Sequence, residues 1–424
     1  MSAAAHVRTG SRIVMKFGGT SVADLDRIRN VAARVKREVE AGNQVAVVVS
    51  AMSGVTNQLV KFCTDLSALH DQREYDAVVA TGEQVTSGLT AIALQEIGVA
   101  ARSYQGWQIP LSTDGQHGKA RIEAIDGSGL IAAMEAGQVP VVAGFQGIGP
   151  ESRIATLGRG GSDTSAVALA AALKADRCDI YTDVDGVYTT DPRMVPKARK
   201  LKRIAYEEML ELASVGAKVL QTRSVELAMK MRVRVQVLSS FASDNILILG
   251  GDLPGSLVVD EDEIVEQEIV SGIAYSRDEA KITVRHIPDR PGVAAAIFGP
   301  LSAAGVNVDM IVQNIGADAA STDLTFTIGK TDLPRAKAVL GEQQDKIGYA
   351  ELVADADVAK ISVVGVGMRS HAGVANTMFT ALAAKGINIQ VISTSEIKVS
   401  VLIGADYTEL AVRALHTAYG LDAA

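Results

Sequence analysis

Apolar residues in roughly the first 250 positions form short continuous runs, and stretches with helical spacing separate these runs. The runs are rich in β-branched residues and predict strands at Ile13–Phe17, Val45–Val49, Val139–Ala143, Asp179–Thr182 and Val233–Leu238. The stretches between them predict helices at Asp24–Glu40, Ser165–Lys174, Glu207–Leu212 and Ser214–Met231. Continuously apolar strands that alternate with helices favour a mainly parallel sheet covered on both faces, an α/β fold of three αβα layers.

The final third of the chain contains an internal repeat. Ile282–Val293 is echoed by Ile361–Val374, and Leu301–Val308 is echoed by Leu382–Ile389. Each copy continues into a β-rich run and a second helix, at Thr322–Ile328 and Leu333–Leu340, and at Ile397–Ile403 and Tyr407–Tyr419. This order predicts a ferredoxin-like βαββαβ unit in each copy. Because neither copy carries catalytic groups, we interpret the pair as ligand sensors.

These patterns divide the chain into four parts. We expect a catalytic α/β domain at residues 12–245, a linker at 246–263, a first repeat at 264–348 and a second repeat at 349–424. The linker is indicated by paired glycines and many acidic residues.

Composition narrows the function classes. The 424 residues are 48% hydrophobic and 4% aromatic with a net charge of −8, which argues against a nucleic-acid surface. Cys63 and Cys178 are too few for a disulfide framework, and residues 1–11 lack the apolar core of a leader, so we expect a cytoplasmic protein. The longest apolar stretch, Ala166–Leu173, is far shorter than the roughly 20 residues of a membrane span. The six His residues lack metal-ligand spacing, so no protein metal site is expected.

Two glycine-rich turns carry the candidate chemistry. Lys16–Ser21 follows the first strand, and Gly158–Thr164 precedes an Ala-rich helix; each contains a cation. Glycine lets a backbone approach a phosphate closely, and a helix N-terminus offers unpaired N–H groups to an anion. The P-loop, Rossmann and protein-kinase motifs are absent from the sequence. Together the turns indicate a site of another design for a polyphosphate and a second anion.

At this point the motifs resemble those of a known family. Lys16-Phe-Gly-Gly-Thr-Ser, Ser50-Ala-Met-Ser-Gly-Val-Thr-Asn, Thr81-Gly-Glu, Leu157-Gly-Arg-Gly-Gly-Ser-Asp and the segment Thr182–Arg193 resemble aspartate kinases in order and spacing. The two repeats look like the paired ACT domains of that family. The resemblance implies an amino-acid-kinase fold followed by ACT domains. It also implies transfer of the γ-phosphoryl group of ATP to the side-chain carboxylate of L-aspartate, which gives 4-phospho-L-aspartate.

The physical chemistry agrees with that implication. A side-chain carboxylate is already ionised at pH 7, so phosphoryl transfer to it needs no general base. Cations, backbone N–H groups and Mg²⁺ must instead overcome the repulsion between the two anions. The Mg²⁺ is expected to be held mainly by the phosphates of ATP.

The resemblance assigns roles by position. It makes Lys16, Arg159 and Asp163 catalytic, with Lys16 at the transferring phosphoryl group and Arg159 also on the α-carboxylate of aspartate. Glu83 is expected to hold the ammonium of the substrate. The remaining residues implied in substrate binding are Ser50, Thr56, Gly160, Gly161 and Ser162. Those implied in nucleotide binding, besides Lys16, are Phe17, Gly18, Gly19, Thr182, Asp183, Tyr188, Thr189, Thr190, Asp191, Pro192, Arg193 and Lys218.

The repeats are expected to bind lysine, threonine or both, and so to give feedback control of a first step towards lysine, threonine and methionine. The effector residues implied in the first repeat are Asp289, Arg290, Pro291, Gly292, Val293, Ala294, Asn307, Val308, Asp309 and Gln313. Those in the second repeat are Val374, Ala375, Asn388, Ile389, Ser395 and Glu396. Exposed ferredoxin-like sheets pair edge to edge, so a homo-oligomer is expected, with or without a shorter subunit made of the repeats alone.

Several of these residues also have a purely structural interpretation. Ser162 or Asp163 could cap the helix that follows, and Thr81-Gly-Glu-Gln reads as a capping box around Glu83. Asn307 and Asn388 could be helix C-cap residues. Ser50 and Thr56 could be ordinary loop hydroxyls, and Lys218 a solvated helix lysine.

Two other functions compete with aspartate kinase activity. One is a kinase of the same fold that acts on glutamate, acetylglutamate, carbamate or a nucleotide, against which the paired repeats and Thr81-Gly-Glu argue. The other is an inactive amino-acid sensor, which is expected to have lost Lys16, Arg159 or Asp163; all three are present.

Overall fold

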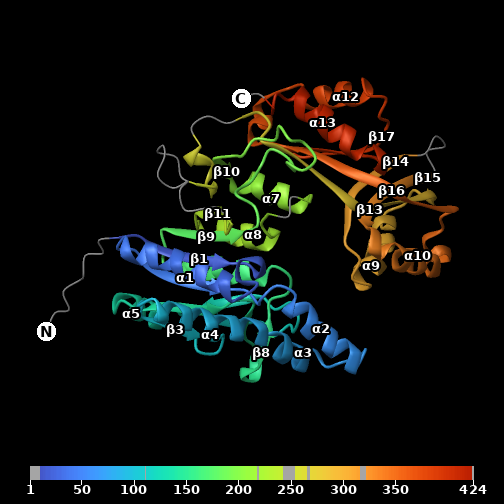
Figure 1. Ribbon diagram of the computed structural model, residues 1–424. Helices are drawn as coiled ribbons and strands as arrows, with labels where there is room; N and C mark the ends of the chain where they lie inside the picture. The colour runs from blue at the N-terminus through green and yellow to red at the C-terminus, as the bar shows by residue number, and fades with distance from the viewer. Residues whose placement is uncertain are drawn as a thin grey trace. The chain divides into compact units, whose positions relative to one another are not determined.

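The computed structural model describes residues 10–109, 111–216, 219–241, 254–264, 268–315 and 321–422 (Figure 1). The chain divides into two compact units. The first contains residues up to 187, 200–213 and 218–265, and the second contains 188–199, 214–217 and everything from 266 onwards.

An eight-stranded sheet forms the centre of the first unit. Its strand order is β10-β12-β11-β9-β1-β2-β6-β3, and all neighbours are parallel except β11 and β12. The strands are β1 (Arg12–Phe17), β2 (Gln44–Val49), β3 (Ala101–Tyr104), β6 (Val139–Ala143), β9 (Arg177–Thr182), β10 (Arg203–Ala205), β11 (Val235–Ser239) and β12 (Ser256–Val259). Every residue of β1 and β6 is buried, which is typical of a parallel sheet covered on both faces. The mainly parallel αβα architecture is confirmed.

Alternation along β1 decides which side chains reach each helical layer. Ile13, Met15 and Phe17 belong to the core that includes Ile28 and Val35 of α1. Since neighbouring side chains on a strand point to opposite faces, Lys16 is directed towards the other layer, where α6 packs against β1. The helices of this unit are α1 (Leu25–Glu40), α2 (Val55–Leu66), α3 (Gln72–Val79), α4 (Thr81–Glu96), α5 (Ser128–Glu135), α6 (Gly161–Ala172), α7 (Tyr206–Ser214) and α8 (Thr222–Met231).

A small four-stranded sheet lies at one end of the first unit, with β8 beside α3 (Figure 1). Its order is β5-β4-β7-β8, with strands β4 (Leu111–Thr113), β5 (Ile122–Ile125), β7 (Gln146–Ile148) and β8 (Ile154–Thr156). The short 3₁₀ helices of the unit are η1 (Gly19–Val22), η2 (Pro150–Ser152) and η4 (Glu261–Glu263).

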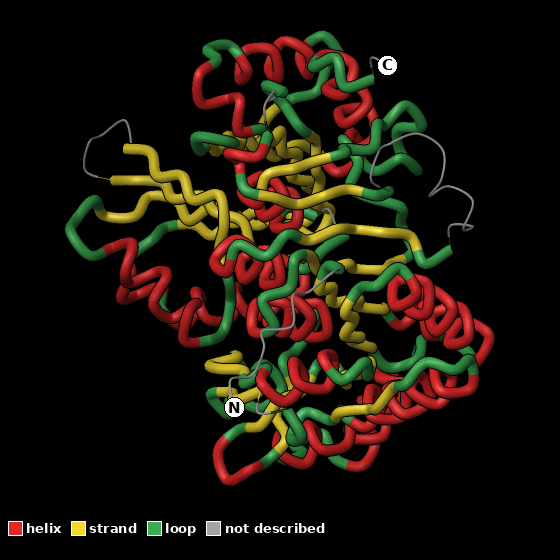
Figure 2. Tube along the Cα trace, turned by 90° about the vertical axis from the view of Figure 1, so that its left-hand side faces the viewer, coloured by secondary structure: helices red, strands yellow, loops and turns green. Residues whose placement is uncertain are grey.

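The second unit is built on a six-stranded antiparallel sheet of order β14-β15-β13-β16-β18-β17. Its strands, yellow in Figure 2, are β13 (Gly272–Pro288), β14 (Val308–Ile315), β15 (Ser321–Gly329), β16 (Glu351–Val364), β17 (Ile389–Thr394) and β18 (Lys398–Gly404). The helices are α9 (Val293–Ala303), α10 (Leu333–Glu342), α11 (Gln344–Ile347), α12 (Val374–Ala383) and α13 (Thr408–Ala418). Three 3₁₀ helices complete it: η5 (Lys330–Asp332), η6 (Val366–Ser370) and η7 (Ala405–Tyr407).

Each repeat has its own core, and the two share the long strands β13 and β16. The end of β13 pairs with the start of β16, Glu351–Ala354, in the first repeat. The start of β13, Gly272–Ser276, pairs with the end of β16 in the second repeat. The second repeat thus takes its fourth strand from the start of β13, which lies within the range expected for the first repeat. The ferredoxin-like units are confirmed, but the strand pairing passes through the expected boundary at residue 348 instead of stopping there.

Three further structural findings concern membrane spans, metal clusters and the cysteines. Among the described residues, no helix is both long and apolar enough to cross a membrane. In the same ranges no three His, Cys, Asp or Glu side chains gather as metal ligands. Cys63 and Cys178 are both buried and free.

Candidate active site

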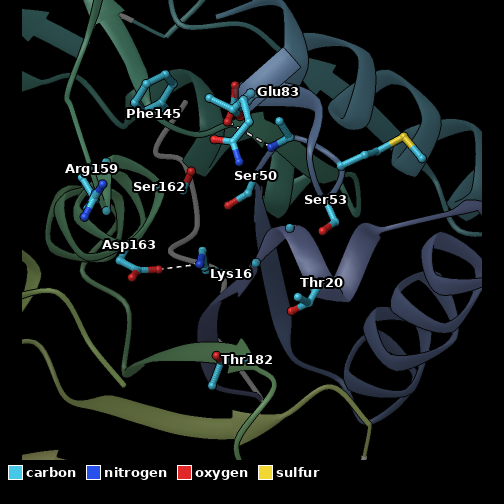
Figure 3. Close-up of a pocket in the computed structure, with 18 of the residues that line it drawn as sticks. Lys16, Thr20, Ser50, Ser53, Glu83, Phe145, Arg159, Ser162, Asp163 and Thr182 are labelled. Carbon is cyan, nitrogen blue, oxygen red and sulfur yellow. Dashed lines mark hydrogen bonds and ion pairs between the residues drawn. The ribbon is translucent and has the colours of Figure 1, made fainter. Parts of the chain in front are cut away.

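A pocket of about 440 Å³ opens in the first unit, at the carboxyl ends of β1, β2 and β9 (Figure 3). This is the edge at which parallel sheets place their ligands. Twelve of the predicted site residues line it: Lys16, Gly18, Gly19, Ser50, Thr56, Glu83, Arg159, Gly160, Gly161, Ser162, Asp163 and Thr182. They come from five separate stretches of sequence, so the fold brings together the motifs that the sequence analysis singled out.

Lys16 supplies a buried positive charge at the floor of this pocket. The residue is only 7% exposed, and its Nζ lies 2.5 Å from Oδ1 of Asp163 (Figure 3). Of the two glycines that follow it, Gly19 occupies a crowded position, whereas Gly18 has room for a Cβ at ordinary contact distance. A Cβ on Gly18 would lie 3.4 Å from the Lys16 Nζ, and one on Gly19 would lie 3.0 Å from the Ala51 carbonyl oxygen. The turn therefore keeps backbone close to the ammonium.

Asp163 stands in the first turn of α6 and does not cap that helix. The N-cap is Gly160, in the left-handed region at φ 71°, and no side chain makes a capping hydrogen bond there. The alternative in which Ser162 or Asp163 is the cap is therefore wrong. Instead the Asp163 carboxylate holds Lys16, and the Gly161 N–H donates to the Gly158 carbonyl at 2.9 Å.

Arg159 lies at the rim of the pocket (Figure 3). It is exposed, and its guanidinium makes no ion pair or hydrogen bond with any described residue. Its position is set by the backbone, since Gly158 and Gly160 on either side both have positive φ. A planar guanidinium without a protein partner is suited to bidentate binding of a carboxylate ligand.

Glu83 is a buried carboxylate, 3% exposed, in the first turn of α4. One oxygen accepts a hydrogen bond from the Ala51 N–H at 3.0 Å, while Oε2 is buried with no hydrogen-bond partner among the described residues. The N-cap of α4 is Ala80, without a side-chain cap, so the capping-box interpretation is wrong. Burial raises the pKa of Glu83 to about 7. A buried carboxylate with an unused oxygen is a site for a ligand cation.

Several further residues line the pocket without having been predicted as site residues from the sequence. These are Thr20, Ala51, Met52, Ser53, Gly54, Asn57, Phe145 and Gly158. Phe145 has φ 69°, an uncommon backbone for a residue with a side chain, and its N–H donates to Ser165 Oγ at 3.1 Å. A position just beyond the buried strand β6 was the available signal, because ligand contacts gather after such strands.

Other predicted nucleotide contacts lie outside the pocket lining. The Phe17 ring stacks on Tyr181 with centroids 4.6 Å apart, so it packs in the core and faces away from the site. Asp183 is exposed just beyond Thr182. Lys218 falls outside the described residues.

The rest of the predicted nucleotide segment, Tyr188–Arg193, belongs to the second unit. There Val195, a little further along, joins the core of the second repeat. Thr189 is fully buried, with its Oγ1 2.9 Å from His416 Nε2, and its carbonyl accepts from the Ile273 N–H. Nearby, Asp191 pairs with Arg193, and Thr190 and Pro192 complete the segment. These contacts fix the segment on the second repeat.

The predicted effector residues occupy equivalent places in the two repeats. Gly292 and Gly373 are the N-caps of α9 and α12, with φ 92° and 102°. Asp289, Arg290 and Pro291 are exposed before α9, as are Asn307 and Gln313 after it. Val293 and Val374 are buried, Ala294, Val308, Ala375 and Ile389 are half-buried, and Asn388, Ser395 and Glu396 are exposed. The C-caps are Ala304 and Ala384, so the C-cap interpretation of Asn307 and Asn388 is wrong.

Asp309 differs from its neighbours because its carboxylate is already occupied. Lys360 Nζ lies 2.8 Å from Asp309 Oδ2 and 2.9 Å from Glu279 Oε1. Lys360 is buried, and its charge lowers the pKa of Asp309 despite partial burial of that carboxyl group. An effector ammonium would therefore compete with a protein cation at this position.

Comparison with known proteins gives the family. The amino acid kinase family model matches residues 11–239, and ACT domain models match 282–343 and 361–419. The aspartate kinase of Pseudomonas putida is 56% identical over 412 residues, which cover 97% of this chain and 98% of that protein.

Solved structures agree. E. coli aspartokinase III in complex with aspartate and ADP (R-state) superposes with a TM-score of 0.78 at 26% identity, covering 96% of this chain and 99% of that one. The same enzyme in complex with lysine and aspartate (T-state) gives a TM-score of 0.75 at 26% identity, covering 96% and 98%. The chain is therefore a kinase that belongs to the amino acid kinase family, among the aspartokinases with two ACT domains.

Proposed function

We propose that this chain phosphorylates the side-chain carboxylate of L-aspartate with ATP, giving 4-phospho-L-aspartate and ADP. The observation that carries the proposal is the joint presence of Lys16, Arg159 and Glu83 in one pocket. The lysine suits a phosphoryl group, and the unpaired guanidinium suits a carboxylate. The buried carboxylate suits an ammonium. E. coli aspartokinase III, which resembles this chain, binds aspartate and ADP.

The α-carboxylate and the α-ammonium of the substrate are proposed to hold it in the pocket. Arg159 binds the α-carboxylate through two parallel N–H donors, and the free oxygen of Glu83 accepts the ammonium. Ser50, Thr56 and Ser162 line the same pocket and orient the side-chain carboxylate. A carboxylate oxygen then attacks the γ-phosphorus, a new P–O bond forms, and the bond to the β,γ-bridging oxygen breaks to release ADP. No proton has to be removed, since the nucleophile is already an anion at pH 7.

Lys16 stabilises the charge that gathers on the phosphoryl group during transfer, and Asp163 keeps the ammonium in place. The Gly18 and Gly161 N–H groups donate to the Tyr181 and Gly158 carbonyls, so we propose that other backbone N–H groups of the glycine turn after Lys16 and of the first turn of α6 contact the phosphates. Thr182, Asp183 and Lys218 are proposed to bind the nucleotide.

Mg²⁺ is proposed to accompany ATP. The two carboxylates of the pocket are engaged, Asp163 with Lys16 and one Glu83 oxygen with the Ala51 N–H. The donor set therefore suits a cation that the nucleotide phosphates hold, with these side chains outside its coordination sphere.

Trapping of the acyl phosphate with hydroxylamine tests the activity. The purified chain, Mg-ATP and hydroxylamine are incubated with L-aspartate, L-glutamate, N-acetyl-L-glutamate, carbamate or UMP. The proposal predicts hydroxamate from aspartate and no ADP release with UMP or carbamate. Turnover of another member of this panel in preference to aspartate would contradict it, and binding without turnover would indicate a sensor.

We further propose that lysine, threonine or both bind the ACT repeats and inhibit the kinase, as the first step of a route to lysine, threonine and methionine. The glycine N-caps of α9 and α12, at which no side chain caps the helix, support a carboxylate site in each repeat. The lysine complex of E. coli aspartokinase III is consistent with this. A homo-oligomer formed through the repeats, with or without an ACT-only subunit, is part of the same proposal. Analytical ultracentrifugation of the expressed gene product, with and without effectors, tests it, and a monomer under both conditions would contradict it.

A further inference from the structure

A second buried carboxylate, Asp76, lies outside the pocket and takes no part in the chemistry proposed above. It belongs to α3 and is fully buried, with 0% exposure. A buried carboxylate is costly unless several donors satisfy it. The groups that donate hydrogen bonds to Asp76 show which segments of the chain it connects.

Among the described residues, the hydrogen-bond partners of its carboxylate come from the end of β8 and from the loop at residues 117–118, both next to the turn that carries Arg159. Thr156 donates twice, through its N–H at 3.0 Å and its hydroxyl at 2.5 Å. The Gly118 N–H donates at 3.0 Å, and His117 Nδ1 lies 2.7 Å from the same carboxylate oxygen. Asp76 thus ties α3 to the end of β8 and to the loop at residues 117–118.

Thr156 is the last residue of β8 and leads directly into the turn that carries Arg159. Its carbonyl accepts from the Ala120 N–H at 2.9 Å. Gly158, two residues on, has φ 75°, and a Cβ there would lie 3.1 Å from the Gly118 carbonyl oxygen. The turn that carries Arg159 therefore packs against the loop at residues 117–118, whose Gly118 N–H donates to Asp76.

Arg223 of α8 also contacts the backbone of these two segments. Its two terminal nitrogens donate to the carbonyls of Leu157 and Ala120, both at 2.7 Å. The Arg159 guanidinium itself has no partner among the described residues, so nothing but the backbone of the turn fixes its place. A carboxylate that fixes this backbone controls where the guanidinium meets a ligand.

We propose that Asp76, acting through Thr156, is a positioning residue that sets the affinity for the α-carboxylate of the substrate by fixing the turn that carries Arg159. This inference rests on the proposed role of Arg159 in holding that carboxylate. Asp76 does not touch the substrate. Loss of its contacts displaces Arg159 and leaves Lys16 and the nucleotide side of the pocket in place.

The experiment compares Thr156→Val, which removes the hydroxyl donor, with Thr156→Ser, which retains it. Steady-state kinetics at pH 8 follow ADP release with L-aspartate or Mg-ATP varied. Thr156→Val is expected to raise the KM for aspartate about tenfold, the scale of a lost hydrogen bond to a charged group, with KM for ATP and kcat nearly unchanged. Thr156→Ser is expected to keep the KM for aspartate at the wild-type value. Asp76→Asn is expected to act like Thr156→Val and more strongly.

Asp179→Asn is the matched control. Asp179 is equally buried, pairs with Arg177 on β9 and does not line the pocket. We expect this control to lower thermal stability while the KM for aspartate stays at the wild-type value. If it raised that KM as much as Asp76→Asn does, the effect would be one of general destabilisation and the inference would be overturned.

The Arg159→Lys background separates the inference from the proposed function. If Asp76 acts through Arg159, adding Thr156→Val to Arg159→Lys is expected to raise the KM for aspartate by less than twofold further. A full tenfold additional rise would overturn the inference. If Arg159→Lys alone raised that KM and Thr156→Val did not, the inference would fail while the proposed function stood. If Arg159→Lys left it unchanged, the assignment of Arg159 would fail, and the inference with it.

Discussion

Replacing Glu83 with Gln is expected to stabilise the folded kinase unit at pH 8 and at the same time to weaken aspartate binding. Burial raises the pKa of this carboxyl group to about 7, from an ordinary value of 4.5. The folded protein therefore keeps a proton on Glu83 that the unfolded chain releases between pH 4.5 and 7. Stability falls as the pH rises through that window and is constant above it. The Gln side chain does not titrate, so it adds no such pH dependence to the stability of the Glu83→Gln variant.

The magnitude follows from the two pKa values. Each pH unit between them is worth about 1.4 kcal/mol, so the interval corresponds to a stabilisation of about 3 kcal/mol for Glu83→Gln at pH 8. Most of this difference is expected to appear between pH 5 and pH 8. Trp107 is the only tryptophan of the chain and lies in the same unit. Its fluorescence during urea unfolding is therefore a suitable probe.

Aspartate binding supplies the second arm of this test. If the ionised Glu83 holds the substrate ammonium, the KM for aspartate at saturating Mg-ATP is expected to fall about tenfold from pH 6 to pH 8, because the fraction of free carboxylate rises through pH 7. In Glu83→Gln the KM is expected to be high and independent of pH. A wild-type KM that does not change over this range, together with a stability difference equal at pH 5 and pH 8, would refute the reasoning.

Three further predictions concern the pocket and the repeats. Arg159→Lys is expected to raise the KM for aspartate far more than that for ATP, because Lys keeps the charge but lacks the planar fork; equal rises would contradict the assignment. Lys16→Met is expected to lower kcat by about 10²–10³ with small changes in KM, as for other groups that act on transition-state charge; a change in KM at constant kcat would show a role in ground-state binding only. Asn307→Ala is expected to weaken inhibition by lysine or threonine and to leave uninhibited turnover nearly intact; full inhibition with normal effector binding, measured by calorimetry, would remove the first repeat from the regulation.

Much of the pocket could be predicted because its chemistry is local in sequence. Lys16 and Arg159 each stand in a glycine-rich turn next to a regular element, so charge, flexibility and position coincide within a few residues. The sheet was predictable for a similar reason, since strands such as Val139–Ala143 are continuously apolar. Phe145 carries no such signature, because an ordinary aromatic residue in a loop becomes a pocket residue only through the fold.

What could not be predicted depends on contacts between distant parts of the chain. Asp76 meets Thr156 across 80 positions, and neither residue belongs to a motif. Thr189 looked like part of a nucleotide segment, but its hydroxyl is buried against His416, 227 residues away. The fourth strand of the second repeat comes from Gly272–Ser276, because strand pairing depends on edge and register, which periodicity within the repeat does not specify.

The position of the new phosphoryl group tests the central claim most directly. The reaction of this chain with Mg-ATP and L-aspartate is quenched with borohydride, which reduces an acyl phosphate to an alcohol, and the amino alcohol is identified by chromatography against standards. Phosphorylation of the side-chain carboxylate predicts homoserine, formed by the wild type and strongly reduced in Lys16→Met. Recovery of 3-amino-4-hydroxybutanoate would mean that the α-carboxylate is phosphorylated, and would contradict the placement of that group on Arg159.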